Sequence, residues 1–327
     1  MDVPTRMKAW TCRRYGGPEV LTLEDVPVPA IGPDELLVRV LATTVSSADS
    51  RVRALRLPPG FGPVGRLMLG FRGPRRPILG TEVSGLVLAA GRKVSLFGVG
   101  DPVIAFLDTK MGGHAELAAI RETGLIVGKP ANLSFEAAAS LCFGGLTARD
   151  YMRKAGLAPG ERLLVIGAAG AVGSAFVQLA SQMGAHVTAV TSAGHVEQVR
   201  ALGADLVIDH ARENFIAGGR SWDVIADTVA ASSFGRCLPA LRRGGRYLSI
   251  AGGLADMLIG KRGDKRCISG PARSRLEDMR ELGRSAQSGA YTPLIDSIHG
   301  FKDMREAHRR VDAGRKRGSV VVRVADA

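Results

Sequence analysis

A glycine-rich turn carries the most recognisable chemistry in this sequence. It reads Gly167-Ala168-Ala169-Gly170-Ala171-Val172-Gly173, a pattern of the form A-x-G-x-x-G in which Ala168 takes the place of the usual first glycine. Between a strand and a helix, such a turn lets backbone N–H groups meet a pyrophosphate at the helix N-terminus. Glycine-rich turns also serve plain packing of a helix on a strand, so the surroundings of the turn must decide between the two interpretations.

The surroundings favour dinucleotide binding. A predicted strand at 162–166 precedes the turn and a predicted helix at 171–183 follows it. A second predicted strand, 186–191, begins about 20 residues after the turn, which is the order of a dinucleotide-binding βαβ unit. We therefore predict that a dinucleotide binds the residues of the turn, which are Ala168, Ala169, Gly170, Ala171, Val172 and Gly173.

The residues after that second strand indicate which dinucleotide is used. An enzyme specific for NAD usually has Asp or Glu here to bind the adenosine ribose, but this chain reads Thr191-Ser192-Ala193-Gly194-His195. A carboxylate would repel a 2′-phosphate, whereas Ser192, His195 and His210 can donate hydrogen bonds to one. We predict NADPH as the cofactor. The alternative is that these three are ordinary turn and helix residues.

Strands and helices continue to alternate beyond these residues. Further strands are predicted at 206–208, 222–227 and 246–251, and further helices at 196–202 and 234–241. Short apolar strands joined by helices predict an α/β fold with a parallel, doubly wound sheet of the Rossmann type. An amphipathic helix at 275–288 and a last strand at 319–324 follow.

The N-terminal third has a different pattern. Glycine and proline separate short apolar runs at 36–42, 83–90, 103–107 and 117–120, which predicts a β-rich domain. Residues 58–77 are dense in Gly, Pro and Arg, and we expect a surface loop or short helix there that could act as a lid. Ser134 is predicted to cap a helix at 135–141.

The amino-acid composition limits which kinds of partner and cellular location the sequence predicts. Lys and Arg number 44 against 31 Asp and Glu, a net charge of +13, but only 5% of residues are aromatic, so platforms for stacking nucleic-acid bases are scarce and we expect no nucleic-acid partner. The four cysteines are far apart, with no disulfide framework or Cys-x-x-Cys zinc site. Neither a signal peptide nor an apolar run of roughly 18 residues occurs, so we expect a cytoplasmic protein without a membrane segment.

The order of segments resembles the medium-chain dehydrogenase/reductase superfamily, in its zinc-free quinone oxidoreductase branch. The likeness runs nearly end to end, and no single motif carries it. Its main motifs are Tyr15-Gly16-Gly17-Pro18-Glu19-Val20-Leu21, Val45-Ser46-Ser47-Ala48-Asp49, Gly80-Thr81-Glu82-Val83-Ser84-Gly85, Gly112-Gly113-His114-Ala115-Glu116, Leu146-Thr147-Ala148, Leu202-Gly203-Ala204-Asp205 and Arg317-Gly318-Ser319-Val320.

The resemblance implies a domain organisation. A GroES-like β-rich catalytic domain would span 1–124 and be completed by 291–327, with the Rossmann cofactor domain at 125–290. Dimers are usual in this branch, so the resemblance also implies a homodimer.

The resemblance further assigns roles to residues. Ser46 and Asp49 would face the nicotinamide and substrate, and Thr147 would contact the nicotinamide. Ser192, His195 and His210 would surround the adenosine phosphate, while Ala251 and Gly252 would lie beside the carboxamide. The family often has Asn at position 46, Lys at 195 and Tyr at 210, where this chain has Ser46, His195 and His210. These differences concern the residues that would orient the substrate and bind the phosphate.

Zinc alcohol dehydrogenases of the same superfamily have Cys near position 46, His in a Gly-His-Glu sequence and a lobe with four closely spaced cysteines. This chain has Ser46, Gly80-Thr81-Glu82 and no such lobe. Without thiolate and imidazole ligands a tetrahedral zinc lacks its donors, so we predict no metal site.

A cleft without metal suits hydride transfer from NADPH to a quinone or an α,β-unsaturated carbonyl. Ser46 and backbone N–H groups are our candidates for hydrogen bonds to the substrate oxygen. Asp49 and His114 could return a proton, or could simply hold their loops. The alternatives are a metal-free carbonyl or alcohol oxidoreductase, and an NADPH-binding protein with little turnover that contacts RNA, as the zeta-crystallins of this family suggest.

Overall fold

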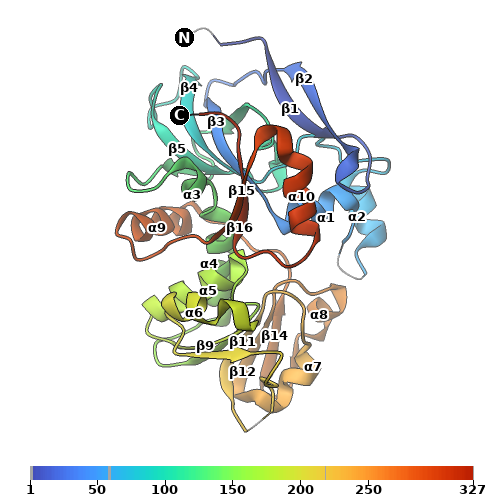
Figure 1. Cartoon of the computed structure of the whole chain (residues 1–327), viewed down its shortest axis with the longest axis vertical. Helices are drawn as coiled ribbons and strands as arrows, with labels where there is room; N and C mark the ends of the chain where they lie inside the picture. Colours follow the sequence, from blue (N-terminus) through green and yellow to red (C-terminus); the bar gives the residue numbers. More distant parts are fainter. Residues whose placement is uncertain (1–2, 58–59, 218, 327) are drawn as a thin grey trace. The chain divides into compact units, whose positions relative to one another are not determined.

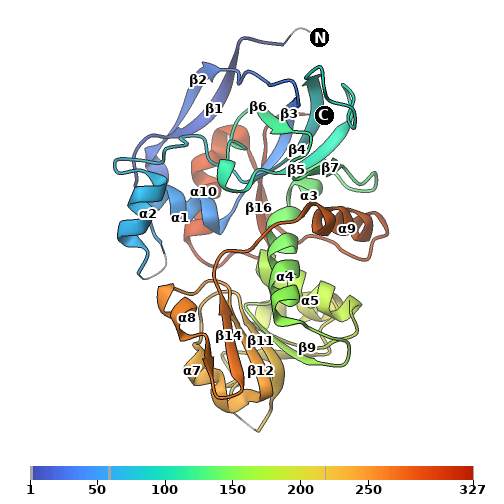
Figure 2. The same ribbon diagram turned by 180° about the vertical axis from the view of Figure 1, so that it is seen from behind.

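The computed structural model describes residues 3–57, 60–217 and 219–326, which form two compact units (Figures 1 and 2). The first unit contains Met1–Leu57, Gly62–Phe143 and Arg275–Ala327, and the second contains Pro58–Phe61 and Gly144–Ser274. The α/β class, with a GroES-like β-rich part and a Rossmann sheet, is confirmed.

The predicted domain boundaries, 1–124 with 291–327 and 125–290, differ from this division. Both predicted boundaries lie inside the first unit, because one further strand pairs with its sheet and two further helices pack on it. Strand β7 (Ile126–Gly128) pairs with β5 (Pro102–Phe106), and helix α9 (Leu276–Gln287) packs on β7. Helix α3 (Phe135–Ala139) packs on neighbouring strands of the same sheet.

The main sheet of the first unit has the strand order β15-β16-β3-β4-β5-β7, with β6 also paired to β3. Its other strands are β3 (Glu35–Val45), β4 (Glu82–Ala90), β6 (Leu117–Arg121), β15 (Ile295–Gly300) and β16 (Ser319–Arg323). Strand β3 lies inside the sheet, and almost all of its residues are buried, Thr43 and Thr44 included. A separate antiparallel pair joins β1 (Arg6–Cys12) to β2 (Leu21–Pro27).

The helices of the first unit are α1 (Ser47–Ala54), α2 (Gly62–Leu69), α3, α9 and α10 (Met304–Asp312). Of these, α3, α9 and α10 pack on strands of the main sheet, and α1 packs on α10. Helix α10 packs on β15 and β16 (Figure 1). Its buried residues Met304, Ala307, His308 and Val311 are spaced three, one and three apart, which is the stripe of an amphipathic helix.

The second unit is a Rossmann sheet. Its strand order is β10-β9-β8-β11-β12-β14-β13, parallel except for the short pair β13 and β14. The strands are β8 (Arg162–Ile166), β9 (His186–Thr191), β10 (Leu206–Asp209), β11 (Trp222–Asp227), β12 (Leu241–Ser249), β13 (Lys261–Arg262) and β14 (Lys265–Ser269). The first six strands in this order give the 3-2-1-4-5-6 arrangement of dinucleotide-binding folds.

Helices flank both faces of the Rossmann sheet. Helices α5 (Ala171–Gln182) and α6 (Val196–Ala201) connect strands that succeed one another in one direction from β8, whereas α7 (Phe234–Cys237) and α8 (Leu254–Ile259) connect strands in the other direction, so right-handed crossovers put the two pairs on opposite faces. Helix α4 (Cys142–Ala155) starts at the last residues of the first unit and continues in the second. None of the helices that the structure describes is long and apolar enough to cross a membrane.

Some predicted elements begin or end elsewhere. The helix predicted at 234–241 stops at Cys237 and continues only as a 3-10 turn, because Pro239 cannot donate to the helix. Strand β12 therefore begins at Leu241 rather than at 246. The segment predicted as a loop or short helix at 58–77 contains α2, while Pro58 and Pro59 lie outside the described residues. Ser134 caps α3 as predicted, since its side chain accepts from Ala137 N.

Candidate active site

The glycine-rich turn joins β8 to α5, and its residues have two separate roles. Gly167 has φ of +81°, and its N–H, like that of Ala168, donates to Val190 O on the neighbouring strand. A Cβ on Gly173 would lie 2.1 Å from Gly167 O, so glycine is required there for α5 to start against the turn. These residues hold the turn together.

The other residues of the turn present the helix N-terminus. Gly170 is the N-cap of α5, and a Cβ there would meet only Gly167 O, at 3.4 Å. The first N–H groups of a helix, here those of Ala171 and Val172, have no partner inside the helix. The space at Gly170 and these N–H groups together make a cradle that can accept an anion.

The chain after β9 brings the three predicted phosphate contacts to one end of the sheet. Ser192 follows β9 directly, and His195 ends a 3-10 turn and caps α6. His210 follows β10, and its N–H donates to Thr191 O at 3.1 Å. The Nδ1 atom of His195 is buried and has no hydrogen-bond partner among the residues that the structure describes. An orphaned ring nitrogen here is a feature that a ligand would satisfy.

In the first unit, Ser46 and Asp49 form a capping box at the start of α1. Asp49 N donates to Ser46 Oγ at 3.2 Å, while Ser46 N and Ser46 Oγ donate to Asp49 Oδ2 at 2.7 and 2.6 Å. Gly80 N donates to the other carboxylate oxygen of Asp49 at 2.9 Å. Both oxygens of Asp49 therefore hold loops, and the hydroxyl proton of Ser46 is already donated to Asp49.

Comparison with known proteins agrees with both the Rossmann sheet of the second unit and the β-rich fold of the first. Residues 32–131 match a family described as alcohol dehydrogenase GroES-like domain, and residues 202–322 match a family described as zinc-binding dehydrogenase. A 2-methylene-furan-3-one reductase of Solanum lycopersicum is 31% identical over 98% of this chain and 80% of its own length. The chain belongs to the medium-chain dehydrogenase/reductase superfamily.

Two more members of the superfamily extend the comparison. The NADPH-dependent alkenal/one oxidoreductase of Arabidopsis thaliana is 29% identical over 98% of this chain and 80% of its own length. The solved structure of the quinone oxidoreductase from Coxiella burnetii superposes with a TM-score of 0.87 at 27% identity, covering 98% of this chain and all of that one. The resemblance to this superfamily predicted from the sequence is thus confirmed.

The positions that hold catalytic zinc in other members of the superfamily carry hydroxyls here. Ser46 is engaged with Asp49, and Thr81 Oγ1 is buried without a hydrogen-bond partner within residues 3–57, 60–217 and 219–326. No group of three His, Cys, Asp or Glu side chains in those same ranges is arranged to hold a metal ion. A donor set of two neutral hydroxyls does not fit zinc, which binds thiolate, imidazole and carboxylate.

Glu82, the third residue of Gly80-Thr81-Glu82, is fully buried. Its carboxyl accepts from Thr44 Oγ1 at 2.6 Å and from Phe143 N at 2.7 Å. The pKa of Glu82 is raised to about 7, chiefly by burial and also by the negative charge of Asp49, while hydrogen bonds from Thr44 and from the backbone at Phe143 and Cys142 act in the opposite direction. Near neutral pH this carboxyl is therefore divided between its charged and neutral forms.

His114, the alternative proton donor, is packed rather than exposed. Its ring is completely buried, and Nε2 lies 3.0 Å from Thr44 O. Burial lowers the pKa of His114, and the charge of Asp49 only partly opposes this. The geometry therefore matches the interpretation in which His114 holds its turn.

Thr147 lies on α4 in the second unit, close to the glycine-rich turn. A Cβ on Gly144 would lie 2.3 Å from Ala171 O, so the start of α4 packs directly on the start of α5. Thr147 follows Gly144 by about one helical turn. The structure therefore brings α4 to the same helix N-terminus that carries the cradle.

The predicted carboxamide contacts, Ala251 and Gly252, follow β12 in a loop that Asp256 holds. Ser249 Oγ and Gly253 N donate to Asp256 Oδ2 at 3.0 and 3.1 Å. A Cβ on Gly252 would lie 1.9 Å from Ser249 Oγ and 2.1 Å from the same oxygen, so a side chain there would displace the hydrogen bond between Ser249 and Asp256. Asp256 was not predicted from the sequence, although an acidic residue in the first turn of a helix was a usable signal.

Asp227 was missed as well. It ends β11, is fully buried, and accepts from Val229 N, Ala231 N and Ser232 N and from the hydroxyl of Tyr247. The loop that it folds covers the turn, because a Cβ on Gly167 would meet Thr228 Oγ1 at 2.7 Å. Asp227 thus shapes the carboxyl edge of the Rossmann sheet, where ligands of such folds bind.

Proposed function

We propose that this chain is an NADPH-dependent oxidoreductase that transfers a hydride to a quinone or an α,β-unsaturated carbonyl without zinc. The observation that carries the proposal is the open cradle at Gly170, at the N-terminus of α5 and the carboxyl edge of the Rossmann sheet. The names of the relatives, a furanone reductase, an alkenal/one oxidoreductase and a quinone oxidoreductase, support the substrate class.

The residues of the second unit fit the cofactor. A pyrophosphate matches the unpartnered N–H groups of Ala171 and Val172. The orphaned Nδ1 of His195, next to Ser192 and without a carboxylate in the segment 191–195, supports a 2′-phosphate at the end of β9. When bound, the nicotinamide supplies the hydride, and the protein supplies position and hydrogen bonds.

The first unit would supply the hydrogen-bond donors that the substrate oxygen needs. Because Ser46 donates its proton to Asp49, we propose that Ser46 and Asp49 position the start of α1. The N–H groups of Ser47 and Ala48, in the first turn of α1, would then donate to the developing oxyanion. This differs from the sequence-based expectation, in which the Ser46 hydroxyl itself makes that hydrogen bond.

The test is the consumption of NADPH with quinones, enones, aldehydes and ketones, combined with product analysis and metal analysis. We expect turnover of quinones or reduction of the C=C bond of enones, unaffected by chelators, in protein with no stoichiometric zinc. Reduction of C=O instead would favour the metal-free carbonyl or alcohol oxidoreductase. No turnover of any substrate, together with salt-sensitive retention of RNA, would favour the NADPH-binding protein with little activity.

A further inference from the structure

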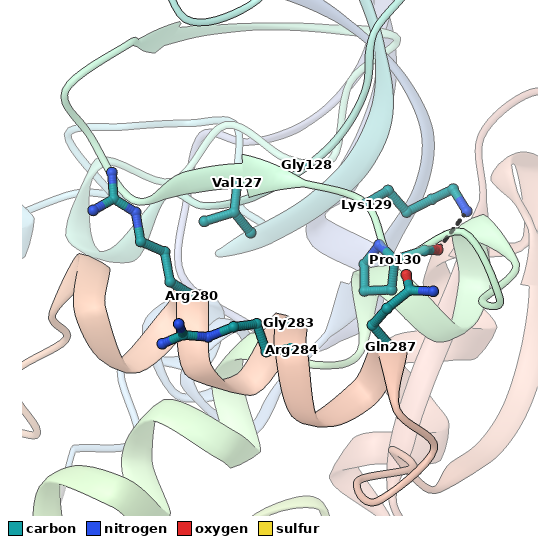
Figure 3. Close-up of a pocket in the computed structure, with 8 residues that line it drawn as sticks. All are labelled: Val127, Gly128, Lys129, Pro130, Arg280, Gly283, Arg284 and Gln287. Atoms are coloured by element: carbon teal, nitrogen blue, oxygen red, sulfur yellow. Dashed lines mark hydrogen bonds between the residues drawn. The ribbon is translucent and has the colours of Figure 1, made fainter.

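A groove lies between β7 and α9 on the first unit, outside every site described above (Figure 3). Its volume is about 400 Å³. It is lined by Val127, Gly128, Lys129, Pro130, Arg280, Gly283, Arg284 and Gln287. We call it the β7–α9 groove.

Two arginines on one face of α9 give the β7–α9 groove its charge. Arg280 and Arg284 are four residues apart, so their side chains are neighbours on the helix surface. Both extend toward the same end of the groove, away from Gln287 (Figure 3). No acidic residue is among those that line it.

Neither guanidinium has a carboxylate within ion-pair distance in the part of the chain that the structure describes. Other arginines of the chain are used differently. Arg246 pairs with Glu161 at 2.6 Å, and Arg310 pairs with Asp296 at 2.6 Å. Two adjacent positive charges without a counter-charge repel each other, and an anion between them would relieve that repulsion.

Glycines leave the groove open. A Cβ on Gly128 would meet nothing within 4 Å, and one on Gly283 would only touch Val127 Cγ2 at 4.0 Å. Lys129 does not fill the space, because its Nζ donates to Pro130 O and Leu133 O. The apolar part of the wall is formed by Val127 in the middle of the groove and by Pro130 toward Gln287 (Figure 3).

Gln287 adds an oriented donor at the far end. Its Oε1 accepts from Ala131 N at 2.7 Å, which fixes the amide and leaves its nitrogen to donate. The groove thus combines two guanidinium groups, one amide donor and an apolar wall. Guanidinium groups match phosphate oxygens in pairs, and the three free oxygens and nearly twofold negative charge of a phosphomonoester suit two arginines better than the single charge of a carboxylate does.

We propose that the β7–α9 groove binds a small phosphomonoester, with its phosphate between Arg280 and Arg284 and its organic part on Val127 and Pro130. This site is distinct from the dinucleotide cradle, whose residues all belong to the second unit. The proposal does not depend on the proposed catalytic function.

Calorimetric titration of the full chain with phenyl phosphate, at constant ionic strength and without NADPH, tests the site. We expect saturable binding that the Arg280→Gln/Arg284→Gln variant weakens about 10-fold or more, since charge-assisted hydrogen bonds are lost. The matched control, Arg92→Gln/Lys93→Gln, removes two exposed positive charges elsewhere in the same unit and should bind within about twofold of the unchanged chain.

Two further measurements test whether the organic part of the ligand contributes to binding. Inorganic phosphate should bind more weakly than phenyl phosphate, and Gly128→Val, which fills the apolar wall, should weaken only the phenyl compound. Equal binding by the Arg280→Gln/Arg284→Gln variant, an equal loss in the control pair, or equal affinity for both phosphates would overturn the proposal.

Discussion

His114 and His308 meet edge to face, with ring centroids 5.5 Å apart and planes at 88°. Arg53 Nε donates to His308 Nδ1 at 3.2 Å, so the proton of that neutral ring is on Nε2. His114 Nε2 faces Thr44 O and carries its own proton, which leaves His114 Nδ1 as a bare acceptor. His308 Nε2 and His114 Nδ1, both buried, lack partners among the described residues, and a donor and an acceptor that complement each other in this way predict a bridging water.

The histidine pair should make stability depend on pH. Burial lowers the pKa of both rings, and for His308 the neighbouring His114 and Arg53 lower it further. The unfolded chain then binds more protons than the folded one below about pH 6.5, so this contribution to stability is lost as the pH falls. We expect His114→Phe to flatten this dependence in urea unfolding between pH 5 and 7.5, and an unchanged slope would contradict the assignment.

Glu82 should make stability depend on pH in the opposite direction to the histidine pair. Its pKa is about 7 in the folded chain and 4.5 as an unperturbed group, so the folded chain binds the extra proton between these values and stability falls as the pH rises through them. Each pH unit in this window is worth up to about 1.4 kcal/mol. The groups that act on it or feel its charge are Asp49, Cys142, Tyr291 and Lys316.

The Glu82→Gln variant measures this effect. Its stability relative to the unchanged chain should increase from pH 5 to pH 7, because glutamine keeps the shape and never ionises. Urea denaturation at each pH gives the difference directly. A difference that is constant over this range would mean that Glu82 titrates outside it.

The two glycines of the turn should respond differently to alanine. Gly173→Ala places a Cβ 2.1 Å from Gly167 O and should destabilise the chain, which a lowered melting temperature would report. Gly170→Ala has room to fold, since its Cβ lies 3.4 Å from the nearest atom, but should obstruct a pyrophosphate. Fluorescence titration of folded Gly170→Ala with NADPH should therefore show weakened binding, and undiminished affinity would exclude the cradle as the cofactor site.

Ser46→Ala and Asp49→Asn test the capping box. Ser46→Ala removes the acceptor of Asp49 N and should cost about 0.5–2 kcal/mol of stability. Asp49→Asn should cost more, about 1–3 kcal/mol, because an amide nitrogen cannot accept from Gly80 N or from Ser46. If Ser46→Ala instead left stability intact and abolished turnover, the hydroxyl would be a catalytic residue rather than a positioning one.

Cofactor preference depends on His195. His195→Ala should weaken NADPH binding several-fold and leave NADH binding nearly unchanged, because only NADPH has the 2′-phosphate. His195→Lys should strengthen the preference for NADPH. Equal losses for both cofactors in His195→Ala would show that the residue shapes the turn and does not read the phosphate.

The Rossmann elements were predictable from the sequence because each is a short apolar run with a local signal. Strands β8, β9 and β11 have the predicted bounds, and α5 starts at the predicted Ala171. The β1–β2 pair was missed, since polar and charged residues fill half of β2, and its register depends on contacts distant in sequence. Helix α10 was missed too, although its apolar residues have helical spacing.

The candidate site was predictable to a lesser degree. Motif residues such as Gly173 could be predicted because a side chain at that position would collide with the backbone of the turn. The orientation of the Ser46 hydroxyl proton could not be predicted, because whether Ser46 donates to a substrate or to Asp49 depends on a hydrogen bond that only the folded loop defines. The dimer and the cytoplasmic location that the sequence suggested stay predictions.

The interrupted first unit has a consequence for the order of synthesis. Strand β3 pairs with β16, which leaves the ribosome after the whole of Gly144–Ser274, a continuous stretch that can fold as soon as it emerges. Until β16 arrives, the edge of β3 from Ala42 to Val45 remains open, and open apolar edges attract other strands. Nascent chains stalled after residue 274 should therefore contain a protease-resistant Rossmann fragment attached to an aggregation-prone N-terminal half.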